Sequence, residues 1–320
     1  MKKHRVIFMG TPDFALPCLE ALAADPEYEV VLVMSQPDRQ SGRGLRVQAP
    51  PVKKLAESLG LKMFQPESLL EAEIQEEVLS YQPDFIITAA YGLLLPQEII
   101  QGAKIAAFNL HASLLPKYRG SAPIQRAIFA GEKKTGITSM FMIDELDGGD
   151  ILLQERIEIG EYEDYGSVYA RLKELAARVM LQTMEAFIQG KIRPQAQDEK
   201  MVTYAPHIER TDQEIDFNHR AEELKDQIRG LSPMPGAIVH LEGKLLKIWQ
   251  VRVIDENAKK GIPGEIIKAD QDGLHVACAQ GVLALEKVQP AGKRAMDYDV
   301  FLRGNPIALG TLLTNKLKEN

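Results

Sequence analysis

The sequence predicts an α/β protein in which a doubly wound, mostly parallel sheet is followed by a small β-barrel. Over residues 1–189, apolar strands alternate with amphipathic helices, as in a doubly wound sheet. Over residues 207–320, short strands follow one another between turn-forming residues, as in a small barrel. Residues 190–206 contain few large apolar side chains and include Pro194 and Pro206. We therefore expect two domains, 1–189 and 207–320, joined by a linker at 190–206.

In the first domain, short apolar runs predict buried strands, and apolar residues at helical spacing predict helices. The expected strands are 5–10, 30–34, one near Met63, 84–90, 105–110, 136–143 and 151–159. The expected helices are 12–24, 51–59, 69–81, 122–130 and 164–189. Because a turn at 144–150 separates the last two strands, we expect them to form an antiparallel hairpin. Residues 36–48 are polar and contain glycine, which favours a loop.

In the second domain, the dipeptides Glu242-Gly243, Asp272-Gly273 and Gln280-Gly281 predict turns between short strands. The expected strands are 237–240, 245–253, 264–269, 273–278 and 281–288. Helices are expected at 221–230 and 297–303, one on each side of this series.

Composition limits the function classes. The chain has 320 residues and a formal net charge of −7, which argues against a globally basic nucleic-acid binder but not against a local basic patch. Cys18 and Cys278 lie far apart, so neither a disulfide framework nor a zinc site is indicated. The apolar run after the basic N-terminus is too short for a signal peptide, and no run has transmembrane length. We expect a soluble, cytoplasmic protein without a metal.

The stretch from residue 106 to 123 carries the clearest candidate site. Asn109 and His111 end an apolar strand, and a side-chain period of two places both on the same side of it. The ends of such strands border the ligand crevice of open α/β sheets. An Asn and a His at a strand end can also simply cap backbone groups, so a structural role stays open.

A third candidate is Asp147, which precedes Gly148 and Gly149 after a predicted strand. Glycines allow close backbone approach, so this loop can bring a carboxylate against a ligand. Asp and Gly are equally ordinary residues of a hairpin turn, and the sequence alone does not decide between the two.

Several motifs indicate a family. The string NLHASLLPKYRGSAPI (109–124) resembles the signature of formyltransferases that use 10-formyltetrahydrofolate, and LDGGDI (146–151) resembles their second signature. Relatives mostly carry Thr at the position of Gly148. Further strings resemble the methionyl-tRNA formyltransferase family, namely GTPDFA (10–15), QPDR (36–39), GRG (42–44), TYAP (203–206), IRGLSPMPGA (228–237) and VQPAGKRAM (288–296). Met234 and His207 depart from that pattern, where Trp and Lys are usual.

The resemblance implies a Rossmann-like formyltransferase domain, an OB-type barrel and an amine that attacks a formyl carbon. Asn109 would donate to the resulting oxyanion, a contribution of about 2.7–4 kcal/mol for one such donor. His111 would join that stabilisation or move a proton, and Asp147 would orient His111 or relay the proton. Which of the two acts as the base is left open. The reaction needs neither a covalent nucleophile nor a metal.

The resemblance also implies the binding residues. The expected folate-binding residues are Tyr91, Gly92, Ser113, Leu114, Leu115 and Pro116, in a crevice that spans 85–94 and 113–116. The expected tRNA-binding residues are Arg39, Arg43, Arg46, Lys293 and Arg294, with Lys287 as a weaker candidate. Plain loop packing and solvated surface charge are the simpler alternatives. The expected partners are initiator methionyl-tRNA and the folate co-substrate, with no membrane and with the chain acting as a monomer.

Other functions remain to be weighed. A UDP-amino-sugar formyltransferase or a formyltetrahydrofolate hydrolase would share the candidate catalytic residues but not the tRNA-type motifs. A dinucleotide-dependent oxidoreductase lacks its G-x-G-x-x-G motif after the first strand. An RNA-binding protein without catalysis would leave Asn109, His111 and Asp147 without a purpose.

Overall fold

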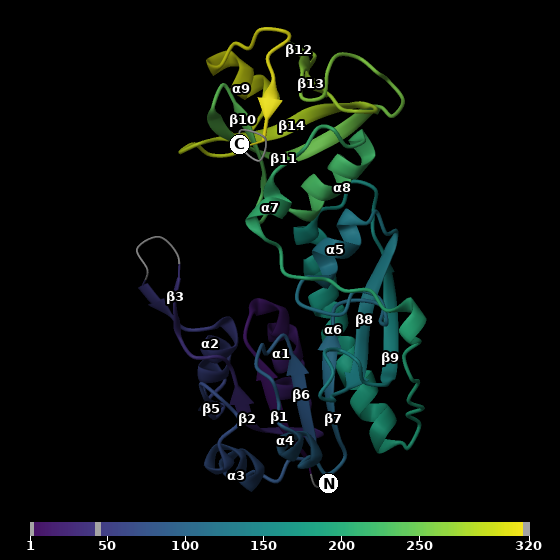
Figure 1. Ribbon diagram of the computed structural model, residues 1–320. Helices are drawn as coiled ribbons and strands as arrows, with labels where there is room; N and C mark the ends of the chain where they lie inside the picture. Colours follow the sequence, from purple (N-terminus) through teal and green to yellow (C-terminus); the bar gives the residue numbers. More distant parts are fainter. Residues whose placement is uncertain (1–2, 42–45, 316–320) are drawn as a thin grey trace. The chain divides into compact units, whose positions relative to one another are not determined.

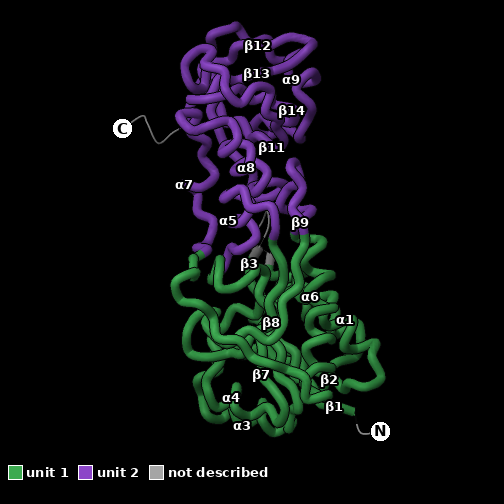
Figure 2. The backbone as a smooth tube through the Cα atoms, turned by 90° about the vertical axis from the view of Figure 1, so that its right-hand side faces the viewer, with its two compact units in different colours: residues 1–120, 135–157, 169–204 green, residues 121–134, 158–168, 205–320 purple. Residues whose placement is uncertain are grey.

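The structure is a computed structural model that describes residues 3–41 and 46–315, and it contains two compact units (Figures 1 and 2). Unit 1 comprises Met1–Gly120, Thr135–Ile157 and Tyr169–Tyr204, and unit 2 comprises Ser121–Lys134, Glu158–Val168 and Ala205–Asn320. Unit 2 therefore includes two short segments that lie between parts of unit 1 in the sequence. The domain boundaries expected from the sequence stay predictions.

Unit 1 is built on a seven-stranded sheet with the order β5-β2-β1-β6-β7-β8-β9. The first five of these strands are parallel, and β8 is antiparallel to β7, which confirms the predicted mostly parallel sheet. The strands are β1 (His4–Gly10), β2 (Tyr28–Met34), β5 (Met63–Phe64), β6 (Phe85–Ala89), β7 (Ala106–His111), β8 (Lys134–Phe141) and β9 (Ile151–Glu158). The α-helices are α1 (Leu16–Ala24), α2 (Pro51–Ser58), α3 (Ala72–Ser80), α4 (Gln97–Gln101) and α6 (Tyr165–Ile188), and there are two 3₁₀ turns, η1 (Asp13–Ala15) and η2 (Glu199–Met201). The first residues of α6 belong to unit 2.

The burial of the central strands β1 and β6 explains why their sequences are apolar. Val6, Ile7, Phe8 and Met9 are completely buried, and all five residues of β6 are buried too. A parallel strand with helices on both faces needs apolar side chains on both sides, so it is a continuous apolar run rather than an alternating one. Register then positions the site, because Thr88 near the end of β6 pairs with Asn109 of β7.

Two predictions about unit 1 are wrong. Residues 36–48, expected as a loop, contain the antiparallel pair β3 (Arg39–Ser41) and β4 (Arg46–Gln48). The short helix α4 is absent from the predicted elements. Backbone pairing in a short hairpin needs no apolar side chains, and a five-residue helix is too short to carry a periodic pattern.

Unit 2 contains a curled antiparallel sheet with the order β12-β13-β14-β11-β10-β16, and β15 pairs with β14. Backbone bonds join its two edges: Ile266 N–H donates to the Thr311 carbonyl and Leu313 N–H to the Gly264 carbonyl, both at 2.8 Å. This closure confirms the predicted small barrel. The strands are β10 (Ala237–Leu241), β11 (Lys244–Asp255), β12 (Ile266–Asp270), β13 (Gly273–Ala277), β14 (Val282–Pro290), β15 (Met296–Asp297) and β16 (Leu313–Thr314). The helices are α5 (Pro123–Phe129), α7 (Arg210–Gln213), α8 (Ala221–Gly230) and α9 (Tyr298–Gly304).

Polar contacts join the segments 121–134 and 158–168 to the rest of unit 2. Arg126 of α5 makes a bidentate ion pair with Asp212, with bonds of 2.8 and 2.7 Å. The buried Arg229 of α8 donates to the backbone carbonyls of Gly160 and Glu163 at 3.1 and 2.9 Å. At Gly230, an added Cβ would lie 2.6 Å from the Phe129 ring, so this glycine permits the close packing of α8 on α5.

None of the helices in the described residues is long and apolar enough to cross a bilayer.

Candidate active site

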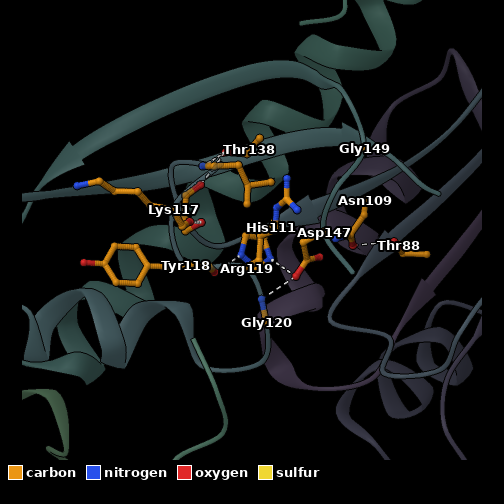
Figure 3. A network of polar contacts seen from close by, with 12 residues as sticks. Thr88, Asn109, His111, Lys117, Tyr118, Arg119, Gly120, Thr138, Asp147 and Gly149 are labelled. Atoms are coloured by element: carbon orange, nitrogen blue, oxygen red, sulfur yellow. Dashed lines mark hydrogen bonds and ion pairs between the residues drawn. The ribbon is translucent and has the colours of Figure 1, made fainter. Parts of the chain in front are cut away.

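Asn109 is fixed by its neighbour on β6. The Thr88 hydroxyl donates to Asn109 Oδ1 at 2.7 Å (Figure 3). This bond sets the orientation of the carboxamide, since Oδ1 is the only acceptor on that side chain. The Asn109 NH₂ group is then the end that can donate to a substrate, and no acceptor for it is found among the described residues.

His111 lies between two oxygen atoms. Its Nε2 is 2.8 Å from the Tyr118 carbonyl oxygen, and its Nδ1 is 3.5 Å from Asp147 Oδ2. A carbonyl can only accept, so Nε2 carries a proton and Nδ1 faces the carboxylate. The side chain of His111 is 7% exposed and that of Asp147 is 12% exposed. The imidazole is therefore held in one orientation, largely out of water.

Asp147 is aimed at His111 by an unusual backbone conformation. Its φ is 51°, in the left-handed region, and the Gly120 N–H donates to its Oδ2 at 2.8 Å. Gln197 donates to the carbonyls of Asp147 and Gly149 at 2.7 and 2.8 Å. Non-glycine residues adopt this conformation at a cost that the surrounding contacts must offset, and such residues cluster at functional sites.

Of the two glycines in this loop, only Gly149 is required by close packing against the backbone. A Cβ at Gly149 would lie 1.9 Å from the Phe141 carbonyl oxygen, so no other residue fits that position without a shift of the backbone. At Gly148 an added Cβ would meet only the flexible Glu145 side chain, at 2.8 Å. The sequence interpretation of this loop as a means of close approach thus applies to Gly149 rather than Gly148.

Arg119 organises the loop that holds His111 and Asp147. Its side chain is completely buried, and it donates to Gln197 at 3.1 Å, Glu145 at 2.6 Å and Glu199 at 2.9 Å. Burial lowers the pKa of its guanidinium, but Glu199 and Glu145 more than offset this and raise the pKa above its ordinary value. The chain neighbours of Arg119 are the two residues whose backbone atoms contact His111 and Asp147. Arg119 therefore fixes the segment between those contacts.

Ser113 and Leu115, predicted to bind folate, belong to a firmly bonded loop. The Ser113 hydroxyl donates to the Lys117 carbonyl at 2.6 Å, and the Thr138 hydroxyl donates to the Ser113 carbonyl at 2.7 Å. The Leu115 carbonyl accepts from Gln154 at 2.8 Å, while Leu114 and Pro116 are only half-buried. Leu114 and Pro116 are thus the members of this group with surface left for a ligand.

Tyr91 and Gly92, also predicted to bind folate, lie just beyond the end of β6. The Tyr91 carbonyl accepts from the Thr11 hydroxyl at 2.8 Å, and the Gly92 carbonyl accepts from Gln36 at 2.9 Å. The Tyr91 ring is buried and its hydroxyl has no partner among the described residues, and burial raises its pKa. Gly92 has a φ of 83°, so its backbone conformation favours glycine.

Unit 1 also contains a pocket of about 440 Å³ beside the Asp147 loop. It is lined by Ile100, Gln101, Ala103, Ile105, Ala106, Ala107, Phe141, Met142, Ile143, Gly148, Gly149 and Asp150. None of the predicted folate-binding residues is in this lining. In the described residues, no group of three or more His, Cys, Asp and Glu is arranged to hold a metal ion.

The predicted tRNA-binding cations lie in two separate regions of the chain. Arg39 is exposed on β3, and Arg46 begins β4, whereas Arg43 lies outside the described residues. Lys293 and Arg294 are exposed in the turn between β14 and β15, and the weaker candidate Lys287 is exposed on β14.

The sequence interpretation missed Thr88, Arg119 and Gln197. Arg119 stands inside the quoted signature string, but a charged residue in a polar loop is ordinarily solvated. Thr88 could have been found from its register opposite Asn109. Gln197 gives no signal in the sequence, because it lies in the segment predicted as a linker.

Comparisons with known proteins show the family to which the chain belongs. Residues 2–184 match the formyl transferase family model, and residues 207–306 match the model of the formyl transferase C-terminal domain. The methionyl-tRNA formyltransferase of Natranaerobius thermophilus is 43% identical over 312 residues, covering 97% of this chain and 99% of the relative. That of Bacillus subtilis is 42% identical over 310 residues, covering 97% of both chains.

Two solved structures share the fold. An N-formyltransferase from Helicobacter canadensis, in complex with folinic acid and dTDP-3-aminofucose, has a TM-score of 0.63 at 15% identity, covering 89% of this chain and 99% of that one. HypX from Aquifex aeolicus, in complex with tetrahydrofolic acid, has a TM-score of 0.60 at 17% identity. It matches 94% of this chain, which spans 47% of HypX. The chain therefore belongs to the methionyl-tRNA formyltransferase family, within the formyl transferases.

Proposed function

We propose that this enzyme transfers the formyl group of 10-formyltetrahydrofolate to the α-amino group of initiator methionyl-tRNA in the cytoplasm. The observation that carries the proposal is the grouping of Asn109, His111 and Asp147 on a rigid framework, with the NH₂ end of Asn109 free to donate. These are the groups that acyl transfer to an amine requires, and the family membership supplies the reaction class.

Asn109 stabilises the negative charge that develops on the formyl oxygen. Thr88 holds the carboxamide with its NH₂ group outward, so little reorganisation is needed when the charge appears. A donor that is already in position costs nothing at the moment of reaction, which is why such groups contribute strongly to the rate.

His111 and Asp147 handle the proton that the attacking amine loses. Because Nε2 is engaged by the Tyr118 carbonyl, the Nδ1 side, which faces Asp147, is the side available for proton movement. A proton taken from the amine can therefore pass along the Nδ1–carboxylate pair toward the folate nitrogen. The pair functions as one unit, and the base is assigned to the pair rather than to either residue.

The two substrates would be held by different parts of the chain. Leu114, Pro116 and the Tyr91-Gly92 turn supply apolar surface and backbone groups that suit a pteridine. Arg39, Lys293 and Arg294 are exposed cations that suit tRNA phosphates. The chain would act as a monomer.

The test is formylation of charged initiator methionyl-tRNA with 10-formyltetrahydrofolate, alongside a UDP-amino-sugar acceptor and a formate-release assay. We expect activity on the tRNA, reduced about 10²–10³-fold in Asn109→Ala. Activity only on the sugar would overturn the acceptor assignment. Formate release without transfer to either acceptor would indicate a hydrolase.

A further inference from the structure

Unit 2 contains a second pocket, which we call the barrel pocket, with a volume of about 610 Å³. It is lined by Tyr162, Asp164, Lys225, Ile228, Arg229, Ser232, Pro233, Trp249, Gln250, Val251, Lys287, Gln289, Arg294 and Ala295. Its volume lies within the range of about 300–1,000 Å³ that is typical of small-molecule sites. Its lining combines an indole, cations and amides, a composition suited to a flat, anionic ligand.

Two of the four cations in the lining are already paired. Lys225 is buried and bonded to Glu222, and Arg229 is buried and bonded to Asp226 and to the carbonyls of Gly160 and Glu163. Their charges are thus largely neutralised inside the protein. These two buried, paired cations therefore add little attraction for a charged ligand.

The other two cations lack partners in the described part of the chain. Lys287 and Arg294 are exposed, and neither has a hydrogen bond or ion pair among the described residues. The one acidic group in the lining, Asp164, already accepts the Ser167 N–H at 2.8 Å at the start of α6. The mouth of the pocket therefore carries two free positive charges, and a phosphate would satisfy both.

Trp249 provides a rigid aromatic wall. Its Nε1 donates to Gln289 at 3.0 Å, and Gln289 donates to the Lys293 carbonyl at 2.8 Å, in the turn that carries Arg294. Gly236 packs so closely on the ring that a Cβ there would lie 2.6 Å from it, and Lys247 Nζ lies 5.3 Å from the ring centroid. An indole held in this way can stack on a base with little loss of side-chain entropy.

We propose that the barrel pocket binds one unstacked nucleotide of the tRNA substrate, with its base on Trp249 and its phosphate between Lys287 and Arg294. This inference rests on the proposed function, and it names the part of the RNA that the second unit recognises. An acidic peptide would satisfy the cations but would leave the indole without a flat partner. A base joined to a phosphate satisfies both. Gln250, which is exposed in the same lining, can bond the edge of the base.

Trp249 is also the only tryptophan in the sequence, so its fluorescence reports on this pocket directly. The experiment titrates the full chain with uncharged initiator tRNA, AMP, CMP and inorganic phosphate, and measures tRNA binding separately by anisotropy of labelled tRNA. We expect tRNA to change the Trp249 emission at the concentrations at which it binds. AMP and CMP should change the emission weakly and compete with tRNA, while phosphate alone should leave it unchanged.

Variants sharpen the test. Lys287→Gln combined with Arg294→Gln should weaken tRNA binding about tenfold or more and reduce the dependence of log K on log salt by about 1 for each phosphate that no longer meets a cation. Lys244→Gln is the matched control, because it removes an exposed charge from the same sheet outside the pocket. Trp249→Leu should weaken binding by about 5- to 150-fold, and Trp249→Tyr should restore most of it. The tyrosine variant also serves if the leucine variant does not fold.

The outcomes separate this inference from the proposed function. If tRNA binds and is formylated while the Trp249 emission stays constant, the pocket proposal fails and the function stands. Equal reductions of affinity in the control and the double variant would also overturn the pocket proposal. Quenching by AMP that tRNA does not displace would make the pocket a site for free nucleotides and overturn the tRNA assignment. A tRNA-dependent emission change without formylation would overturn the function and keep the pocket.

Discussion

The cluster of His111, Asp147 and Arg119 and the barrel pocket use charge in opposite ways. In the cluster, ionisable side chains contact one another and the backbone, and Arg119 is completely buried with three partners. At the pocket mouth, Lys287 and Arg294 are exposed and without partners in the described residues. Chemistry requires groups that are already fixed before the substrate arrives, whereas a large polyanion is bound by charges that are still available.

This contrast predicts which observable each substitution changes. Changes in the cluster should alter the rate of transfer or the stability of unit 1, and leave the affinity for tRNA nearly unchanged. Changes in the exposed cations should alter affinity and its salt dependence, and leave the rate of the bound complex unchanged.

The largest effect is expected for Asp147→Asn, which keeps the shape but removes the charge that faces His111. We expect kcat to fall on the order of 10³–10⁴-fold, as when an aspartate that fixes a catalytic imidazole is neutralised. The KM for tRNA should change less than about twofold. Asp144→Asn, an exposed change in the same loop, is the control for single-turnover formylation. A fall in kcat of similar size in both variants would contradict the role of Asp147.

The next effect concerns stability around Arg119. Glu145 and Glu199 are 54% and 68% exposed, so they remain solvated when Arg119 is removed. Replacing both by Gln instead leaves a buried guanidinium without a counter-charge. We expect the double variant to lower the free energy of unfolding by roughly 1.5–3 kcal/mol, and more than Arg119→Met does. Urea denaturation measures both, and the reverse order would show that the guanidinium itself supplies the stability.

A smaller effect is expected at Lys293, whose side chain is exposed in the turn after β14. Lys293→Gln should raise the KM for tRNA by about three- to tenfold with kcat unchanged, because one phosphate of the tRNA no longer meets a cation. Steady-state kinetics at several salt concentrations test this, with Lys244→Gln as the control. A lower kcat with an unchanged KM would show that Lys293 affects the rate of transfer, and would contradict the assignment of the exposed cations to tRNA affinity alone.

The smallest effect is a pH dependence at Asp212. Burial raises the pKa of this carboxyl, but the bonds and charge of Arg126, the Glu209 N–H and the charge of His207 together lower it more, so the pKa lies below its ordinary 3.8. As the pH falls, the unfolded chain therefore binds a proton at Asp212 before the folded chain does. The stabilisation that the ionised Asp212 carboxylate gives the folded state is present above pH 3.8 and disappears as the pH falls through the folded pKa. We expect Asp212→Asn to cost roughly 1 kcal/mol near neutral pH. Urea denaturation should show that this difference shrinks below pH 3.8, and a constant difference would contradict the linkage.

The sequence predicts elements where burial imposes a pattern. The predicted helix 221–230 has the observed bounds of α8, because Leu224 and Ile228 repeat at helical spacing toward the barrel core. The strand with Asn109 and His111 follows equally from an apolar run that ends in polar residues. The hairpin of β3 and β4 rests on backbone pairing and leaves no such pattern.

The site is predictable only in part for the same reason. Period two places Asn109 and His111 on one side, but the approach of Asp147 depends on a chain reversal with a left-handed residue. The burial of Arg119 depends on Glu145, Gln197 and Glu199, which lie 26 to 80 residues further along the chain. Long-range contacts of this kind are set by tertiary structure and have no local signature.

Because unit 2 includes residues 121–134 and 158–168, it cannot be transferred to another protein as one continuous C-terminal segment without losing contacts. A gene fusion that transplanted only residues 207–320 would separate Asp212 from Arg126 and the buried Arg229 from the carbonyls of Gly160 and Glu163. The barrel would then carry a buried guanidinium stripped of two acceptors, and α8 would be without the α5 surface on which Gly230 packs. Residues 207–320 therefore form a complete second unit only together with the α5 and 158–168 segments.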